Sequence, residues 1–189
     1  RFDRKIGPDP ASIDSAKIGG ILANNASGMC CGIEQNSYQT LDSIRIILAD
    51  GTLVDTGDSL SVNQFRTSHE ALLETLVSIR KRILSNNLLA DRIRYKFRIK
   101  NTTGYSLNAF LDFEDPIDIM AHLMVGSEGT LAFIAEAVYK TVIEHRYKAS
   151  ALVLFKNVED ACSAIPLLRN QPVAAAELMD RASLRSVED

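Results

Sequence analysis

The residues best suited to bind a ligand lie in the stretch IGGILANNASG at positions 18–28. Glycines let a backbone approach a ligand closely because they carry no Cβ. Asparagine and serine side chains supply neutral hydrogen-bond donors and acceptors. These residues flank a short apolar helix, and a packed core does not need that combination. The stretch therefore predicts a backbone cradle for a polar ligand.

Two further segments support this interpretation. The sequence GSEGTL at positions 126–131 follows the apolar run at 123–125 and precedes a stretch rich in strand-forming residues, 131–142. Glycines again flank small hydroxyl residues at the mouth of a strand, where backbone N–H and C=O groups can face a ligand. The sequence GPDPAS at positions 7–12 lies just upstream of the first segment.

Together with NTTGY at positions 101–105, these segments resemble the flavin-binding domain of the vanillyl-alcohol oxidase / p-cresol methylhydroxylase superfamily. Within that group the chain is most similar to the FAD-linked D-2-hydroxyacid dehydrogenases, which act on D-lactate, glycolate or D-2-hydroxyglutarate. Residues 24–32, which end in Met-Cys-Cys-Gly, resemble the large bacterial members that fuse a flavin half to an iron–sulfur half.

The resemblance implies FAD as the cofactor. The pyrophosphate of FAD would lie at the start of a helix beginning near Ala16, where the helix dipole is positive, and main-chain groups of residues 126–133 would contact the edge of the ring. The expected cofactor-binding residues are Pro8, Asp9, Pro10, Ala11, Ser12, Ile18, Gly19, Gly20, Asn24, Asn25, Ser27, Gly28, Gly126, Glu128, Gly129, Thr130, Phe133 and Ile134.

The implied activity is oxidation of D-2-hydroxyglutarate or D-lactate to the 2-oxoacid. Hydride would pass from the substrate Cα to the flavin, and electrons would continue to an iron–sulfur centre, quinone or cytochrome. In the family a histidine base and a carboxylate-binding arginine come from the cap domain, so no catalytic residue is assigned here. The alternatives are another flavin oxidase acting on alcohols, phenols or sugars, and a non-catalytic module that binds an anionic ligand or nucleic acid.

The chain departs from the family pattern in two places. Family members carry a glycine-rich phosphate segment upstream of the 7–12 turn, and this sequence begins just before that turn. We therefore expect an internal fragment that is inactive alone and binds FAD weakly, with any iron–sulfur cluster outside it; tight FAD binding by the 189-residue chain in calorimetry would contradict this. Ala132 stands where the family commonly has glycine, and its methyl group could crowd the flavin.

Composition limits the remaining classes. Of the 189 residues, 46% are hydrophobic and the net charge is −3, which fits an ordinary globular protein and argues against a dedicated nucleic-acid binder. No apolar run approaches the ~18 residues of a membrane span. The first residues lack the apolar core of a signal peptide. We expect a cytoplasmic protein, and peripheral attachment to the inner face of the membrane stays open because it needs no spanning helix.

Cysteine and histidine spacing predicts no metal site. Cys30 and Cys31 are adjacent and Cys162 is distant, which indicates reduced thiols; a vicinal disulfide or a thiol–flavin link is the alternative. The three histidines (69, 122 and 145) share no ligand spacing, so we expect structural or exposed roles for them.

The expected fold class is α+β: the second part of a PCMH-type FAD-binding domain at 1–148, with an antiparallel or mixed sheet and flanking helices, then the start of a ferredoxin-like α+β cap at 149–189. Period-two and period-3.6 patterns predict the elements. These are a helix at 16–25, a strand at 41–48 turning at Asp50-Gly51 into 52–54, a polar connection at 58–63, a helix from Ser68 to about residue 84, strands at 151–155 and 173–178, and a helix at 158–168.

Residues 92–100 alternate basic and apolar side chains, which predicts a strand with one charged face. Three interpretations stay open: a solvated edge strand protected by its charges, a surface for an anionic cofactor or substrate, and a nucleic-acid surface.

Several polar residues also carry two interpretations. Glu128 either contacts the flavin region or orders its own loop, and Tyr105 either packs near the ring or is simply buried. Glu177 and Asp180 are possible general bases, although a carboxylate pair without a partner base is usually structural. Arg181 and Arg185 either face a substrate carboxylate or stabilise a terminal helix.

Overall fold

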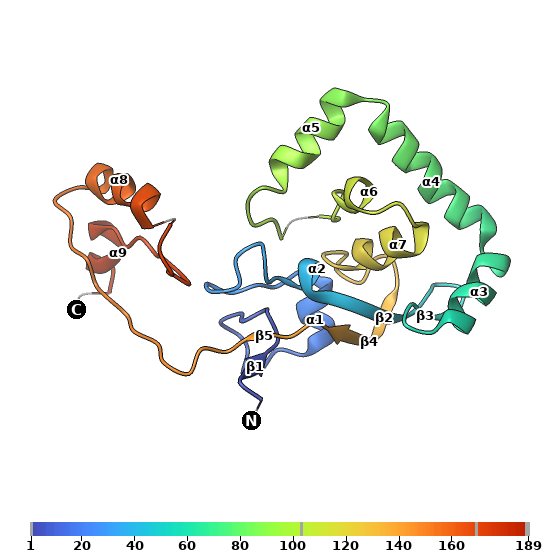
Figure 1. Ribbon diagram of the computed structural model, residues 1–189, viewed down its shortest axis with the longest axis horizontal. Helices are drawn as coiled ribbons and strands as arrows, with labels where there is room; N and C mark the ends of the chain where they lie inside the picture. The colour runs from blue at the N-terminus through green and yellow to red at the C-terminus, as the bar shows by residue number, and fades with distance from the viewer. Residues whose placement is uncertain (1, 103, 169, 188–189) are drawn as a thin grey trace. The chain divides into compact units, whose positions relative to one another are not determined.

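The computed structural model describes residues 2–102, 104–168 and 170–187, so Thr103 of the NTTGY motif lies outside the described residues. Helices and strands mix along the chain, which confirms the α+β class (Figure 1). The chain divides into two compact units, Arg1–Ile143 and Glu144–Asp189.

The first unit contains two antiparallel sheets and a set of helices. The strands are β1 (Arg4–Lys5), β2 (Leu41–Ile47), β3 (Leu53–Asp55), β4 (Phe133–Tyr139) and β5 (Val142–Ile143). The helices are α1 (Ile18–Ala23), α2 (Ser37–Thr40), α3 (Ser59–Ser68), α4 (Glu70–Leu84), α5 (Asn87–Lys96), α6 (Ala109–Asp112) and α7 (Pro116–Met124).

Strand β2 is the centre of the larger sheet, whose order is β3-β2-β4. Ile44 and Ile46 are buried on one face, as their alternation predicts. The predicted turn at residues 50–51 connects β2 to β3, and Gly51 has the positive φ of 86° that such a turn favours. Strand β4 pairs with the other side of β2, so residues 133–139 are held against the strand that begins at Leu41.

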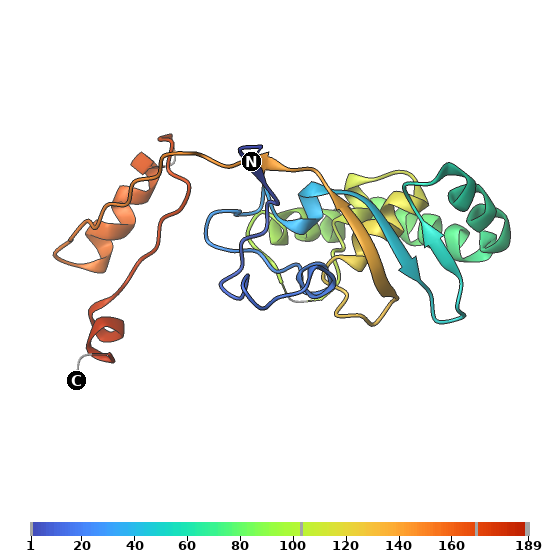
Figure 2. The same cartoon turned by 90° about the horizontal axis from the view of Figure 1, so that it is seen from below.

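One helical layer covers the buried face of this sheet, and Figure 2 shows it behind the strands. Helix α7 packs against β2, and α4 and α6 pack against α7. Asp115 caps α7 by accepting a hydrogen bond from the N–H of Ile117 at 2.9 Å, and Pro116 occupies the first turn. Residues 117 and 119–124 of this helix are all buried, so α7 forms the centre of the core.

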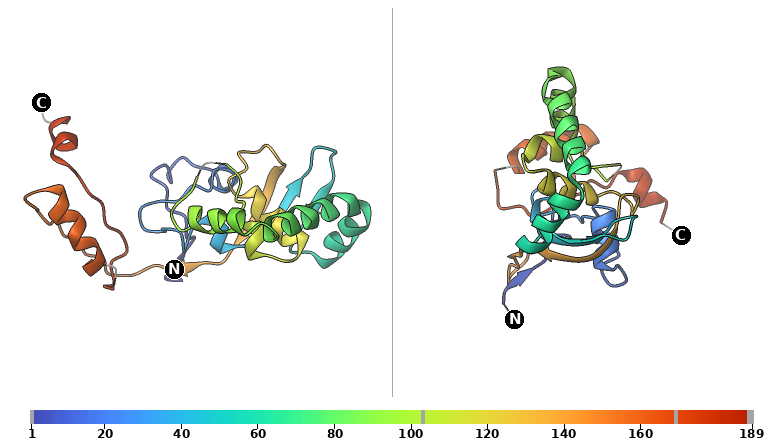
Figure 3. Two further views of the ribbon diagram at one scale, coloured as in Figure 1. Left: turned by 90° about the horizontal axis from the view of Figure 1, so that it is seen from above. Right: turned by 90° about the vertical axis from the view of Figure 1, so that its right-hand side faces the viewer.

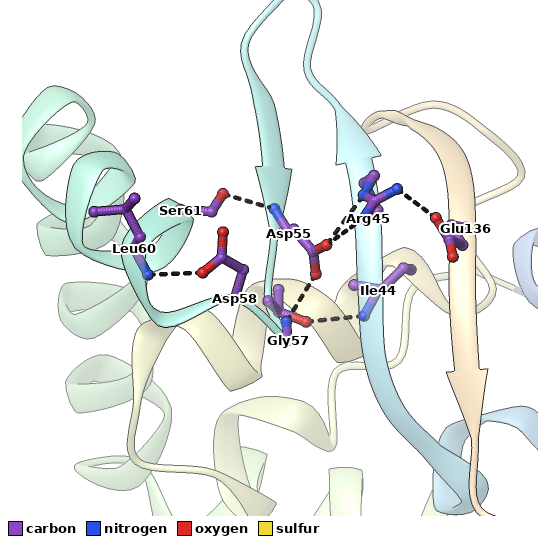
Figure 4. Close-up of polar contacts among 9 residues, drawn as sticks. Ile44, Arg45, Asp55, Gly57, Asp58, Leu60, Ser61 and Glu136 are labelled. Atoms are coloured by element: carbon purple, nitrogen blue, oxygen red, sulfur yellow. Dashed lines mark hydrogen bonds and ion pairs between the residues drawn. The ribbon is translucent and has the colours of Figure 1, made fainter.

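An ion-pair row on the solvent side ties the three strands together (Figure 4). The Arg45 guanidinium donates to the Asp55 carboxylate on β3 at 2.7 Å and to the Glu136 carboxylate on β4. These two carboxylates raise the pKa of Arg45, and Arg45 in turn lowers the pKa of Asp55. The register of the sheet is thus supported by charge on one face and by apolar packing on the other.

Two predicted boundaries at the start of the helical layer were wrong. The polar segment 58–63 is not a connection, because Asp58 caps α3 by accepting from the N–H of Leu60 at 3.0 Å. Helix α4 starts at Glu70 with His69, not Ser68, at its N-cap. Glu70 lies in the first turn, where a negative charge is favourable.

The predicted strand at 92–100 was also wrong, because residues 87–96 form α5. Asn86 caps this helix by accepting from the N–H of Leu89 at 3.1 Å. Ala90 and Ile93 are buried at helical spacing, and Phe97 packs partly against the same core. The alternating cations therefore spread around a helix instead of lining one face of a strand.

The second unit contains α8 (Val158–Leu168), which matches the predicted helix, and α9 (Arg181–Arg185). The strands predicted at 151–155 and 173–178 were wrong, since the described part of this unit contains no strand. A strand needs a neighbour to satisfy its backbone groups, and both segments are largely exposed. Asp180 caps α9 by accepting from the N–H of Ser183 at 2.7 Å, which supports its structural interpretation.

Candidate functional site

The structure brings the two principal glycine segments together. The N–H of Gly126 donates to the carbonyl of Leu22 at 3.0 Å, and the N–H of Glu128 donates to the carbonyl of Ala23 at 2.8 Å. The end of α1 therefore receives two main-chain hydrogen bonds from the loop that precedes β4. Segments about a hundred residues apart in the sequence form one backbone surface.

Side chains strengthen the same junction. Asn24 donates from Nδ2 to Oε1 of Glu128 at 2.7 Å, and Glu128 is exposed with a positive φ of 53°. Such a conformation is uncommon for a residue other than glycine and persists only where surrounding contacts hold it. The Asn24 contact supports the loop-ordering interpretation of Glu128.

The third motif, at 101–105, joins the junction through Gly104 and its neighbours. Gly126 has a φ of 86°, and a Cβ there would stand 3.2 Å from the Gly104 carbonyl oxygen. The Ser106 hydroxyl donates to the Val125 carbonyl at 2.7 Å. The hydroxyls of Tyr105 and Thr130 lie 2.9 Å apart, so Tyr105 is anchored to the 126–130 loop.

The 7–12 turn approaches the end of the first segment so closely that only glycine fits. A Cβ on Gly28 would stand 1.9 Å from the Asp9 carbonyl oxygen and 2.1 Å from the Asp9 carboxylate oxygen Oδ1. Pro8 and Pro10 are buried beside it, whereas Ala11 and Ser12 are exposed. The segments at 7–12 and 126–134 thus both contact the segment at 18–28, and we name this region the cradle: residues 8–12, 18–28 and 126–134.

The two helical glycines in the cradle have no such packing requirement. A Cβ on Gly20 would meet no atom within 4 Å, and one on Gly19 would lie at an ordinary 3.6 Å from the Ile134 carbonyl oxygen. Glycine in a helix costs about 0.5–1 kcal/mol relative to alanine. Since the protein's own packing does not require Gly20, the open surface there suits a ligand that must approach the backbone.

Four polar atoms in the cradle are buried without a hydrogen-bond partner among the described residues: Asp9 Oδ1, Asn25 Oδ1, Ser27 Oγ and Ser127 Oγ. Asn25 and Ser127 are only 7% and 2% exposed. Unpaired buried polar atoms are costly. Each of the three segments supplies at least one of these atoms, which is what a shared polar ligand would explain.

The remaining predicted residues flank this region. Helix α1 begins at Ile18, two residues later than expected, and Lys17 at its N-cap makes no side-chain cap. Phe133 is 68% exposed at the start of β4, and Ile134 is half-buried and paired with Ile46. Ala132 belongs to the apolar core, so its methyl group has a place in protein packing.

Sequence reasoning missed a cavity of about 300 Å³ that adjoins the cradle at Asn25. Ser106 and Asn108 line it together with the apolar side chains of Phe97 and Ile99. Asn108 Oδ1 is a further buried atom without a partner in the described part of the chain. In the sequence, the sign of this cavity is that Ser106 and Asn108 come directly after the NTTGY motif at 101–105.

Burial shifts the pKa values of a cysteine in the 28–32 loop and of a histidine in helix α7. Burial raises the pKa of the Cys31 thiol, with a nearby Ser27 hydroxyl opposing this shift. Burial lowers the pKa of His122, which stacks on Phe113 with ring centres 4.0 Å apart. Among the described residues, no group of three or more His, Cys, Asp or Glu side chains could hold a metal.

Comparison with known proteins agrees with this geometry. Residues 1–57 match the model of the FAD binding domain, and residues 144–189 match the model of the C-terminal domain of FAD linked oxidases. The two matched segments are thus similar to the two domains of FAD-linked oxidases. The segment 126–134 lies outside both matched ranges, and its place in the cradle rests on the geometry above.

Curated relatives extend the similarity over nearly the whole chain. The chain is 23% identical to the glycolate oxidase subunit GlcD of Bacillus subtilis over 96% of its length. It is 25% identical to a D-lactate dehydrogenase of Archaeoglobus fulgidus over 94%, and 22% identical to a D-2-hydroxyglutarate dehydrogenase of Haemophilus influenzae over 92%. The chain spans 28%, 28% and 17% of the lengths of these relatives. No solved structure matches.

The cradle fits part of an FAD molecule. Its unpartnered atoms are hydroxyl, amide and carboxylate oxygens, which suit ribityl hydroxyls and the polar edge of a flavin ring. A carboxylate oxygen is unsuited to a phosphate, so Asp9 would face a donor group of the cofactor.

Proposed function

We propose that this chain is the FAD-binding portion of a flavin-dependent D-2-hydroxyacid dehydrogenase. The observation that carries the proposal is the meeting of three separate segments around buried polar atoms that have no hydrogen-bond partner in the part of the chain the structure describes. The names of the relatives, which include D-lactate and D-2-hydroxyglutarate dehydrogenases, support the 2-hydroxyacid class. We assign 1–148 to the flavin domain and 149–189 to the start of the cap.

When bound, FAD supplies hydride acceptance from the substrate Cα. The chain's own residues bind and orient it. The Asn24–Glu128 contact fixes the 126–130 loop against α1. The buried amide oxygen of Asn25 and the hydroxyl of Ser127 would then hold donor and acceptor groups of the cofactor in one orientation.

The whole protein would oxidise D-2-hydroxyglutarate or D-lactate to the 2-oxoacid. Its electrons would pass to a quinone, a cytochrome or an iron–sulfur centre outside this chain. A cytoplasmic location with access to the inner face of the membrane is consistent with such acceptors. The base and the carboxylate-binding side chain would come from cap residues beyond those described.

Anaerobic titration of the full-length protein tests the activity. Addition of D-2-hydroxyglutarate or D-lactate should bleach the visible flavin absorption, and the L-enantiomers should not. Bleaching by one D-acid names the substrate. A flavin that neither acid bleaches would redirect the assignment to an oxidase of alcohols, phenols or sugars in the same superfamily.

A further inference from the structure

A pronounced charge asymmetry lies far from the cradle in the sequence. Residues 80–100 contain eight lysines and arginines and one acidic residue, in a chain whose net charge is −3. The cations are Arg80, Lys81, Arg82, Arg92, Arg94, Lys96, Arg98 and Lys100. The segment covers the end of α4, the turn, α5 and the four residues after α5, and we name it the basic arm.

Most of these charges are available to a partner. Arg80 donates to the Phe113 carbonyl at 2.8 Å and pairs with Glu114, and Arg94 pairs with Asp91. The other six cations are exposed, and the described residues give them no ion pair. A concentration of unpaired positive charge on one arm attracts polyanionic surfaces.

Exposed apolar side chains lie among these cations. Leu88 is 86% exposed, Tyr95 is 73% exposed and Ile99 is 71% exposed. Leu88 and Tyr95 are seven residues apart on α5, so they share one helix face, with Arg92 between them. The opposite face holds the buried Ala90 and Ile93, which fix the arm to the core.

The arm stands away from the sheet of its unit. Figure 1 shows α4 and α5 forming an arch at the edge of the unit, and the right-hand view of Figure 3 shows them rising from the body. An anionic protein or a nucleic acid would use the cations, and a base could also stack on Tyr95, but neither explains the exposed leucine and isoleucine. An anionic lipid surface uses both, because cations bind its headgroups and apolar or aromatic side chains enter its interface.

We propose that the basic arm docks the protein on an anionic membrane surface. No helix in the described residues is long and apolar enough to cross a membrane. The attachment is therefore peripheral and electrostatic, with shallow insertion of Leu88, Tyr95 and Ile99. The basic arm would then be the surface through which the protein attaches to the inner face of the membrane. This proposal does not depend on which hydroxyacid is the substrate.

Vesicle co-sedimentation of the full-length protein tests the proposal. Vesicles of phosphatidylcholine with 30% phosphatidylglycerol, a roughly physiological anionic fraction, should bind it, and pure phosphatidylcholine vesicles should not. Binding should weaken as salt is raised. Arg92→Gln/Lys96→Gln/Arg98→Gln should lower the affinity roughly 100-fold, at about 1 kcal/mol for each cation.

Two comparisons make the outcome specific. Arg146→Gln/Lys148→Gln/Lys156→Gln removes three exposed cations outside the arm and should change the affinity little. Leu88→Ser/Tyr95→Ser, at two exposed positions on one face of α5, should weaken binding while leaving its salt dependence in place. Equal losses in the two charge variants would overturn the proposal. So would binding to a DNA duplex but not to anionic vesicles, or no binding to either. Flavin content measured in parallel shows whether each variant is folded.

Discussion

Gly20 lies inside α1 with open space where a Cβ would stand, so its effects on folding and on ligand binding can be separated. Gly28 and Gly126 differ, because neighbouring backbone atoms or a positive φ require glycine there. The sequence showed which glycines are grouped but not which of them the fold itself requires. That distinction depends on distances to Asp9 and Gly104, which are remote in the chain.

Gly20→Ala should stabilise the flavin-free protein by up to about 1 kcal/mol, because alanine is the better helix former. The same methyl group should weaken flavin binding about tenfold or more through crowding, at 1–3 kcal/mol for an overpacked contact. Urea unfolding without FAD and titration with FAD measure the two effects. Ser78→Ala, at an exposed position of α4, is the control and should leave flavin affinity unchanged. An unchanged flavin affinity in the Gly20→Ala variant would show that Gly20 does not contact the flavin.

His122 should make stability depend on pH. Burial lowers the pKa of its ring below the ordinary 6.5, and one ring nitrogen lies 2.8 Å from the Asp118 carbonyl oxygen. The unfolded state therefore binds a proton at a higher pH than the folded state. Stability is complete above pH 6.5 and decreases as the pH falls toward the folded pKa, by at most about 1.4 kcal/mol per pH unit.

His122→Phe retains an aromatic ring beside Phe113 and removes the proton. The free energies of unfolding measured at pH 7.5 and pH 5.5 should lie closer together in this variant than in the wild type. An equal difference in both proteins would assign the pH dependence to other groups.

Among the elements, apolar periodicity predicted some correctly and others wrongly. Strand β2 and helix α8 followed their apolar periodicity. Helix α5 did not, because its alternation of basic and apolar residues has period two while Asn86 caps a helix that buries only Ala90 and Ile93. The packing of Ala90 and Ile93 against the core favours the helix over the strand that the alternation predicts. The alternation of residue types does not show which residues the rest of the chain will bury.

Asp58→Ala should destabilise the first unit by about 1 kcal/mol, because it removes the cap that accepts from the N–H of Leu60. Asp91→Ala removes an exposed carboxylate inside α5 that is paired only with Arg94 among described contacts, and it should cost at most a few tenths of a kcal/mol. Urea midpoints of the two variants compare these effects. Equal costs would mean that α3 does not depend on its cap.

In the whole molecule, the motifs and their shared ligand were predicted from sequence, but the contacts that join the motifs were not. One family pattern accounts for the order of four segments in the sequence: 7–12, 18–28, 101–105 and 126–131. The hydrogen bonds from the 126–128 backbone to α1 and the buried atoms of Asn25 and Ser127 appear only in three dimensions. The second unit was predicted least well, since its expected strands have no partners among the described residues.

The central claim is that the cradle holds FAD, and the direct measurement is the amount of FAD bound by the purified full-length protein. The account predicts a yellow protein that releases about one FAD per chain, as expected for a single tight site. Removal of the flavin should lower thermal stability, and re-addition at 100 times the dissociation constant should restore about 2.7 kcal/mol. A colourless protein that cannot be loaded with FAD, and whose unfolding FAD does not shift, would contradict the account.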